Sequence, residues 1–184
     1  MNFFIIHGVY ANPEDNWFPW LKKQLESMNH EVIVPKFPTP LDQSLESWNR
    51  VFSNYESKIN EETVLIGHSL GVAFILNYLE KTNKKIKAAI LVAGFHKPLG
   101  IQYDEINKTF VDKQFNWEKI KNSCGKFIIF ASDNDEYIPL EIGQELSQSL
   151  NAEFNIVHDG GHLNKKVGYD NFPLLLETII IEID

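Results

Sequence analysis

The stretch Val64-Leu65-Ile66-Gly67-His68-Ser69-Leu70-Gly71-Val72-Ala73-Phe74-Ile75-Leu76 is an apolar run that is broken once, by Gly-His-Ser-Leu-Gly. The residues before the break are apolar and β-branched, which is typical of a strand buried on both faces. Residues 70–79 are long and apolar enough for a buried helix. The break is therefore predicted to be a tight strand-to-helix turn with a serine at its tip.

Gly-x-Ser-x-Gly in such a turn is typical of a nucleophile elbow, in which a strained serine projects above the carboxyl edge of the sheet. Gly67 and Gly71 supply the small neighbours that this turn requires. Ser69 is therefore the candidate nucleophile. The N–H of Leu70, at the positive end of the helix, is a candidate donor to an oxyanion. An ordinary glycine-containing loop is the alternative that this stretch alone leaves open.

Composition narrows the class of protein. The 184 residues suffice for one domain, 1–184, that removes roughly 70% of its surface from water. Lys and Arg total 17 against 25 Asp and Glu, a net charge of −8, and the basic residues are scattered. We therefore expect no nucleic-acid partner. The single cysteine, Cys124, excludes an internal disulfide and a cysteine-rich zinc site.

The first apolar run, residues 3–6, is too short for a signal peptide and has no basic region before it. No segment approaches the ~18 consecutive apolar residues of a membrane span. We therefore expect a soluble, cytoplasmic protein with no membrane partner.

The apolar pattern predicts strands and helices in alternation, which favours a three-layer α/β/α sandwich around a parallel sheet. Asp42 is a candidate cap for the second helix. Residues 95–116 lack a regular pattern and are expected to form a lid or a substrate-contacting loop. Strands are predicted at 2–6, 31–35, 63–66, 86–93, 126–131 and 153–158, and helices at 17–28, 45–59, 70–79, 117–123, 139–150 and 172–183.

A serine hydroxyl needs a base within hydrogen-bond reach and a carboxylate that orients the base. In parallel sheets these groups are expected beyond the carboxyl ends of the strands. His162 is the best candidate base, because Asp159-Gly160-Gly161 follows the last strand and lets the loop reach over the sheet edge. His158 is the alternative if that strand ends one or two residues away.

The orienting acid is expected after the strand at 126–131. Asp133, Asp135 and Glu136 all follow that strand, and their spacing alone does not choose among them. One of the three is expected to cap a turn or the helix that begins near Pro139.

The second oxyanion donor is expected in His7-Gly8-Val9, directly after the first strand. Gly8 allows a close approach of the backbone, and the N–H of Val9, or else that of Tyr10, is the candidate donor. His7, Tyr10 and His68 are also expected to contact substrate.

Metal binding by His158, Asp159 and His162 is a rival chemistry for the last loop. Gly160-Gly161 disfavours the helix that would bring both imidazoles to one face, so we expect no metal and no cofactor. The segment Gly67 to Gly71 is neither Gly-x-Gly-x-x-Gly nor followed by Gly-Lys-Ser/Thr, so it does not predict a phosphate-binding loop.

The chain order Ser, Asp, His, with an elbow after one strand and His-Gly after the first, resembles the α/β-hydrolase superfamily. More closely, the sequence is similar to the small, lidless serine hydrolases grouped with retinoblastoma-binding protein nine. The similar segments extend over nearly the whole chain: Ile5-Ile6-His7-Gly8, Trp17-Phe18-Pro19-Trp20-Leu21, Gly67-His68-Ser69-Leu70-Gly71, residues 115–121, residues 132–139 and Gly160-Gly161-His162.

The resemblance implies a minimal α/β-hydrolase fold with a six-stranded parallel sheet in the order 2-1-3-4-5-6. It implies Ser69 as nucleophile, Asp135 as acid and His162 as base, and an esterase-like activity. We expect the substrate to be a small-molecule ester, thioester or activated amide. The retinoblastoma-pocket motif Leu-x-Cys-x-Glu is absent around Cys124, so that partner is not implied. A vestigial hydrolase that serves as an interaction module, and an acyl transferase or carbon–carbon lyase with the same residues, are the alternatives.

Overall fold

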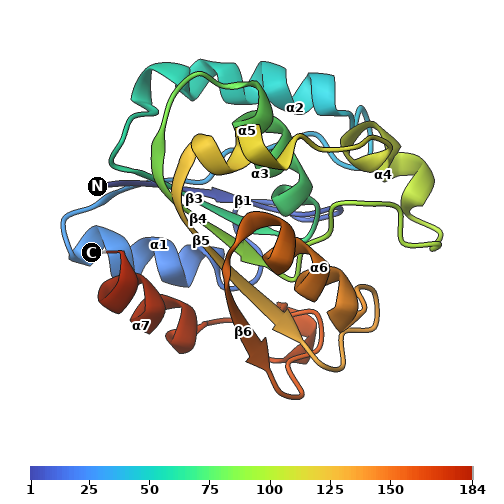
Figure 1. Ribbon diagram of the computed structural model, residues 1–184. Coiled ribbons are helices and arrows are strands. Elements are labelled where there is room, and N and C mark those ends of the chain that lie inside the picture. Colours follow the sequence, from blue (N-terminus) through green and yellow to red (C-terminus); the bar gives the residue numbers. More distant parts are fainter. Residues whose placement is uncertain (184) are drawn as a thin grey trace.

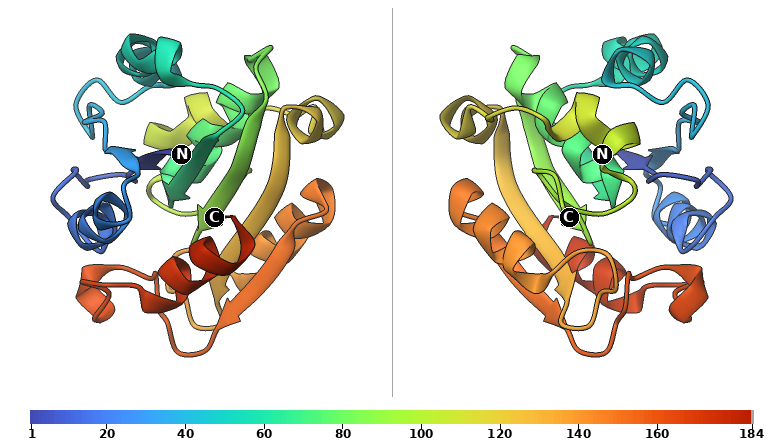
Figure 2. Two further views of the ribbon diagram at one scale, coloured as in Figure 1. Left: turned by 90° about the vertical axis from the view of Figure 1, so that its left-hand side faces the viewer. Right: turned by 90° about the vertical axis from the view of Figure 1, so that its right-hand side faces the viewer.

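The computed structural model describes residues 1–183 and contains a six-stranded parallel sheet between two layers of helices (Figures 1 and 2). The order β2-β1-β3-β4-β5-β6 confirms the predicted sheet and the predicted sandwich. The strands are β1 (Asn2–Ile6), β2 (Glu31–Ile33), β3 (Thr63–His68), β4 (Ile86–Val92), β5 (Cys124–Ser132) and β6 (Glu153–Val157).

The helices cover the two faces of the sheet unequally (Figure 1). The first and last α-helices cover one face, and the helices between them cover the other. They are α1 (Phe18–Ser27), α2 (Leu45–Phe52), α3 (Leu70–Lys81), α4 (Asp104–Val111), α5 (Trp117–Asn122), α6 (Leu140–Leu150) and α7 (Pro173–Glu182), with 3₁₀ turns at η1 (Ser53–Lys58) and η2 (Lys165–Val167).

The central strands explain the continuous apolar runs of the sequence. Every residue of β1 and β3 is buried, because successive side chains point to opposite faces and both faces are covered. In β1, Phe3 and Ile5 join the core under α1 and α7, whereas Phe4 and Ile6 join the core under α2 and α3. The sheet is thus packed between two apolar cores, one on each face.

Helix α4 lies in the segment for which the sequence predicted only a loop. The helix buries Asn107, Phe110 and Val111, which are too few to give an apolar stripe that the sequence would reveal. Tertiary contacts stabilise it instead, since the side-chain amide of Asn77 on α3 donates to Phe110 O at 2.8 Å. The helix therefore depends on packing more than on local propensity.

The predicted cap of α2 is wrong. Ser44, rather than Asp42, precedes the helix, and its hydroxyl accepts a hydrogen bond from Ser47 N–H at 3.1 Å. Ser47 Oγ in turn accepts from Ser44 N–H, which completes a capping box. Ser44 has the extended backbone that a cap requires, whereas Asp42 lies two residues further out.

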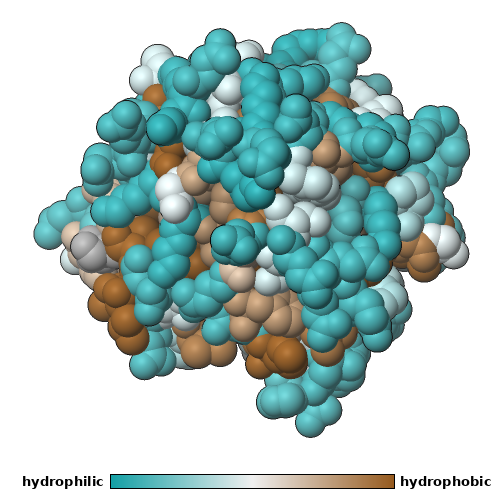
Figure 3. Space-filling model, viewed as in Figure 1, coloured by the Kyte–Doolittle hydropathy of each residue, from teal (hydrophilic) through white to brown (hydrophobic). Residues whose placement is uncertain are grey.

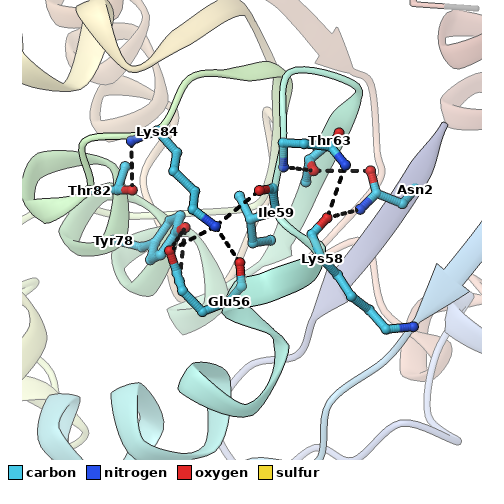
Figure 4. A network of polar contacts seen from close by, with 9 residues as sticks. Asn2, Glu56, Lys58, Ile59, Thr63, Tyr78, Thr82 and Lys84 are labelled. Atoms are coloured by element: carbon cyan, nitrogen blue, oxygen red, sulfur yellow. Dashed lines mark hydrogen bonds and ion pairs between the residues drawn. The ribbon is translucent and has the colours of Figure 1, made fainter.

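A polar network ties the amino ends of β1 and β3 to the η1 turn (Figure 4). Thr63 Oγ1 donates to Asn2 Oδ1 at 3.0 Å, and Asn2 Nδ2 donates to Lys58 O at 2.5 Å. Lys84 Nζ reaches Ile59 O at 3.1 Å in the same network. These contacts stabilise the amino-terminal edge of the sheet. The site is expected at the other edge, where the strands have their carboxyl ends.

The surface facing the viewer in Figure 3 is mostly hydrophilic. Apolar side chains gather at the lower left, over α7, where Leu174, Ile180 and Ile181 are exposed. No helix within residues 1–183 is both long and apolar enough to cross a membrane.

The first turn of α3 touches the end of β1 with almost no space between the two backbones. A Cβ added to Gly71 would lie 2.2 Å from Ile6 O and 2.9 Å from His7 O. Because these are backbone atoms, no side-chain rotation relieves the overlap.

We predict that Gly71→Ala lowers the free energy of unfolding by about 3 kcal/mol or more, because α3 must move away from β1. Urea denaturation at neutral pH measures the change. Lys81→Ala, at the exposed last turn of the same helix, is the control and should unfold near the wild-type midpoint. A wild-type midpoint for Gly71→Ala would contradict the close packing.

Candidate active site

Ser69 lies in the sharp turn between β3 and α3. Its backbone angles, φ 56° and ψ −121°, fall in a region that non-glycine residues rarely adopt, at a cost of order 1–3 kcal/mol. The surrounding backbone holds the turn, because Ser69 N–H donates to Val92 O on β4 at 3.0 Å. The serine is therefore fixed at the carboxyl end of β3 in the strained geometry that the motif predicts.

Small residues around Ser69 make this turn possible. A Cβ on Gly67 would lie 2.8 Å from Ile75 Cδ1 and 2.9 Å from the backbone of Gly71. A Cβ on Gly8 would lie 2.8 Å from Ser69 Cβ and 3.3 Å from Ser69 Oγ. The loop after β1 can thus touch the serine side chain directly.

His162 is hydrogen-bonded to a buried carboxylate. Its Nδ1 lies 2.8 Å from Asp135 Oδ2, and only 2% of the Asp135 side chain is exposed. The other carboxylate oxygen accepts from the N–H groups of Tyr137 at 2.9 Å and Ile138 at 3.2 Å. An ionised carboxylate can only accept a hydrogen bond, so Nδ1 of His162 carries the proton that it donates to Asp135. Nε2 of His162 is therefore left as an acceptor.

The structure pairs Asp133, another candidate acid, with a different histidine. Asp133 Oδ2 pairs with His158 Nδ1 at 2.6 Å, and Asp133 Oδ1 accepts from Asp159 N–H at 2.9 Å. These two bonds lower the pKa of Asp133. The His158 side chain is 82% exposed, so this second pair lies on the surface.

The rival metal site is not assembled. His158 and His162 pair with different carboxylates, and within residues 1–183 no group of three or more His, Cys, Asp or Glu side chains could hold a metal ion.

Ser69 and His162 line one cavity of about 310 Å³. The segment that the sequence placed in a lid or substrate-contacting loop, residues 95–116, supplies a large share of its wall. Most of the wall is apolar or aromatic, and polar side chains complete it. The apolar part is Val9, Tyr10, Phe95, Leu99, Ile101, Tyr103, Tyr137 and Ile138, and the polar part includes Asp15, Asn16, Asn164, Lys165 and Lys166.

This fold and site can be compared with known proteins. The sequence model of the serine hydrolase family matches residues 3–179. The chain belongs to the serine hydrolase family. The match covers nearly the whole chain and confirms a hydrolase as the class of protein.

Two relatives agree with the family match. This serine hydrolase is 33% identical to the Bacillus subtilis (strain 168) protein YdeN over 178 residues, which cover 96% of this chain and 93% of YdeN. It is 30% identical to serine hydrolase RBBP9 of Rattus norvegicus over 147 residues, which cover 79% of this chain and 77% of RBBP9. The resemblance to small α/β-hydrolases of the RBBP9 type is therefore confirmed.

Solved structures agree with the fold. The crystal structure of the ydeN gene product matches with a TM-score of 0.92 and 31% identity, over 97% of this chain and 96% of that one. Est1E from Butyrivibrio proteoclasticus shares the fold at a TM-score of 0.74 with 16% identity, over 97% of this chain and 84% of Est1E.

The two oxyanion donors considered for the β1 loop differ in their partners. Tyr10 N–H already donates to Thr39 Oγ1 at 2.9 Å. The N–H of Val9 has no acceptor among residues 1–183, and Val9 lines the cavity beside Ser69. Leu70 begins α3, so its N–H has no acceptor in a preceding helical turn. Val9 and Leu70 thus keep backbone donors near the serine.

Three tyrosine rings lead from the cavity mouth to the histidine of this serine hydrolase. Ring centroids are 6.1 Å apart for Tyr10 and Tyr103, 6.2 Å for Tyr103 and Tyr137, and 5.0 Å for Tyr137 and His162. These separations are typical of edge-to-face aromatic contacts. The rings come from three loops, so they pack the β1 loop, α4 and the β5 loop together around the cavity.

The prediction that His7 contacts substrate is wrong. Its ring is fully buried, with Nδ1 donating to Gly8 O at 2.9 Å and Nε2 accepting from Phe37 N–H at 3.0 Å. Burial lowers the pKa of His7, so the ring stays neutral. With both nitrogens occupied by backbone groups, His7 holds the β1 loop in place.

His68 does line the cavity, although only 3% of the residue is exposed. Its Nε2–H donates to the backbone oxygen of His162 at 3.0 Å. Burial, and then the neighbouring His162, lower the pKa of His68 from 6.5 to about 3. The ring is therefore a neutral donor at physiological pH.

Two contacts to the His162 loop have no counterpart among the predicted site residues. Trp17 Nε1–H donates to Leu163 O at 3.1 Å, although an aromatic residue in a predicted helix is more often a core residue than a hydrogen-bond donor to a distant loop. Asn134 Oδ1 accepts from Gly161 N–H at 2.7 Å. Its place between two candidate aspartates was a usable signal, because an amide oxygen can bond the opposite loop as a carboxylate does.

We predict that acid destabilises this serine hydrolase between pH 6.5 and about 3. In this window the unfolded chain binds a proton at His68 and the folded chain does not. The free energy of unfolding therefore decreases as the pH is lowered from 6.5 to about 3. One such group contributes up to about 1.4 kcal/mol per pH unit. Urea denaturation at several pH values should show a smaller slope for His68→Gln, and equal slopes would contradict the buried neutral ring.

Proposed function

We propose that this serine hydrolase cleaves small esters, thioesters or activated amides through an acyl-enzyme on Ser69. The observation that carries the proposal is that Ser69 and His162 line one cavity while His162 is bonded to the buried Asp135. The relatives support hydrolysis as the class of reaction.

In the first step, Ser69 Oγ attacks the substrate carbonyl carbon and His162 Nε2 takes the hydroxyl proton. The resulting imidazolium keeps its Nδ1–H on Asp135, whose negative charge lies in a site with little water. Tyr137 N–H and Ile138 N–H bond the same carboxylate, so it cannot rotate away from the ring. Both the tautomer and the orientation of the base are thereby set before substrate arrives.

The carbonyl oxygen gains negative charge in this step. The N–H groups of Val9 and Leu70 are the proposed donors to it. Leu70 follows Ser69 in the chain, and Val9 follows Gly8, which lies against the Ser69 side chain. Backbone donors of this kind cost no reorganisation during the reaction, and each is worth about 10² to 10³ in rate.

The tetrahedral intermediate then collapses and the leaving group departs with the proton from His162. Water, deprotonated by His162 Nε2, attacks the acyl carbon in the second half of the cycle. Collapse of the second intermediate returns the proton to Ser69 Oγ and releases the carboxylic acid. All of these transfers use protein groups and water.

The cavity favours a small substrate with an apolar acyl group. Its volume of about 310 Å³ suits a small ligand, and residues on or near α4 such as Leu99 and Ile101 give it an apolar wall. Lys165 and Lys166 also line the cavity and are exposed to water. We propose that the acyl group packs against the apolar residues on or near α4 and that the leaving group exits past these lysines.

We predict that Ser69→Ala abolishes labelling by a fluorophosphonate probe and lowers ester hydrolysis by about 10⁴-fold or more, because the nucleophile is lost. Turnover of p-nitrophenyl esters from acetate to octanoate measures this and also reports the acyl preference. Ser149→Ala, at a half-buried serine on α6 outside the cavity lining, is the control and should keep full activity. A wild-type protein that takes up no probe would favour the vestigial alternative.

We predict that the two neighbouring Asp–His pairs respond very differently to mutation. Asp135→Asn should lower kcat by roughly 10⁴-fold, because the amide no longer fixes the tautomer of His162. Asp133→Asn disturbs the exposed pair with His158 and the bond from Asp159 N–H, neither of which involves His162, so it should lower kcat less than about tenfold. Steady-state kinetics on one ester compares them, and equal losses would contradict Asp135 as the orienting acid.

A further inference from the structure

The chain segment that carries His162 is wound in an unusual way. Asp159, Gly161 and Leu163 have φ values of 54°, 53° and 47°, so left-handed residues alternate with ordinary ones over five positions. For the two non-glycine residues this conformation is uncommon and costs free energy. Such a segment keeps one shape only if its surroundings hold it.

Three side chains hold the backbone on either side of the imidazole. Asn134 Oδ1 accepts from Gly161 N–H at 2.7 Å, His68 Nε2–H donates to His162 O at 3.0 Å, and Trp17 Nε1–H donates to Leu163 O at 3.1 Å. They come from the β5 loop, the end of β3 and the start of α1. Three consecutive residues are thus each bonded to a different part of the fold.

His68 is the most telling of the three. Its Nδ1 is buried and has no hydrogen-bond partner among residues 1–183. A buried nitrogen of this kind costs free energy that an apolar ring or chain of similar size would avoid. Packing against Trp17 and Phe18, at 6.1 and 5.9 Å between ring centroids, does not require a histidine. The bond to His162 O is the contact that does require an N–H.

We propose that His68 and Trp17 are positioning residues that set the height of His162 above Ser69. This inference rests on the proposed function, because it concerns the same base. The His162 ring packs between His68 and Tyr137, each 5.0 Å away between centroids, and is bonded to Asp135. Its backbone position therefore decides where Nε2 lies, and a displacement of about 1 Å can cost ~10²-fold in rate.

Three substitutions separate this role from simple packing. His68→Met removes the donor and keeps a similar volume, His68→Gln offers an N–H at a similar distance from the backbone, and Trp17→Phe keeps an aromatic ring without the N–H. Phe18→Leu is the matched control, since Phe18 packs on His68 but makes no bond to the His162 loop. Thermal unfolding of each variant identifies any that fails to fold.

We expect His68→Met and Trp17→Phe to lower kcat for p-nitrophenyl acetate by about 10- to 100-fold, with KM within about threefold. His68→Gln should recover most of the loss. In a His162→Ala background, His68→Met should cause no further loss of the residual rate, because His68 acts through His162. Phe18→Leu should lower only the thermal stability.

A second readout needs no substrate. The Nδ1–H of His162, bonded to Asp135, should give a downfield ¹H NMR signal that is absent in His162→Ala and that shifts or broadens in His68→Met. If folded His68→Met and Trp17→Phe keep the wild-type kcat and signal, or if His68→Met lowers the residual rate of His162→Ala equally, the positioning role is overturned. If wild type is inactive but the signal moves, the proposed function fails and the positioning role stands.

Discussion

The close contact of two backbones around Ser69 is the constraint on which the rest of the site depends. The register Ile6↔Gly67 brings the end of β1 level with the end of β3, and Gly71 lets α3 start against Ile6 O. Any side chain at these glycines would force β1, β3 and α3 apart. The strained serine, the donors beside it and the cavity wall all follow from that contact.

On the other side of the site, side chains of the β5 loop are hydrogen-bonded to the β6 loop. Successive residues of one loop bond successive parts of the other: Asp133 binds His158 and Asp159, Asn134 binds Gly161, and Asp135 binds His162. The outer pair is exposed and screened by water, so it adds little stability. The inner pair is buried, so water screens the charge of Asp135 less than it screens that of Asp133.

The sequence is informative wherever burial leaves a pattern. It predicts the sheet and the serine turn, because β1 and β3 are apolar on both faces. It selects His162 through the glycines before it. Only the family resemblance favours Asp135, because Asp133 and Glu136 follow the same strand and position alone does not exclude them. It misplaces His7 and overlooks Trp17 for one physical reason: which polar atom meets which backbone group, 146 residues apart for Trp17 and Leu163, is decided by tertiary packing.

Three histidines lie around the serine turn, and their partners explain how one of them is set apart. His7 and His68 donate to the backbone oxygens of Gly8 and His162, and burial keeps both rings neutral. His162 alone among these three donates to a carboxylate. In the proposed mechanism, the positive charge that forms when His162 takes the Ser69 proton would be balanced by the carboxylate of Asp135. A positive charge on His7 or His68 would have no such partner and would meet only the cost of burial.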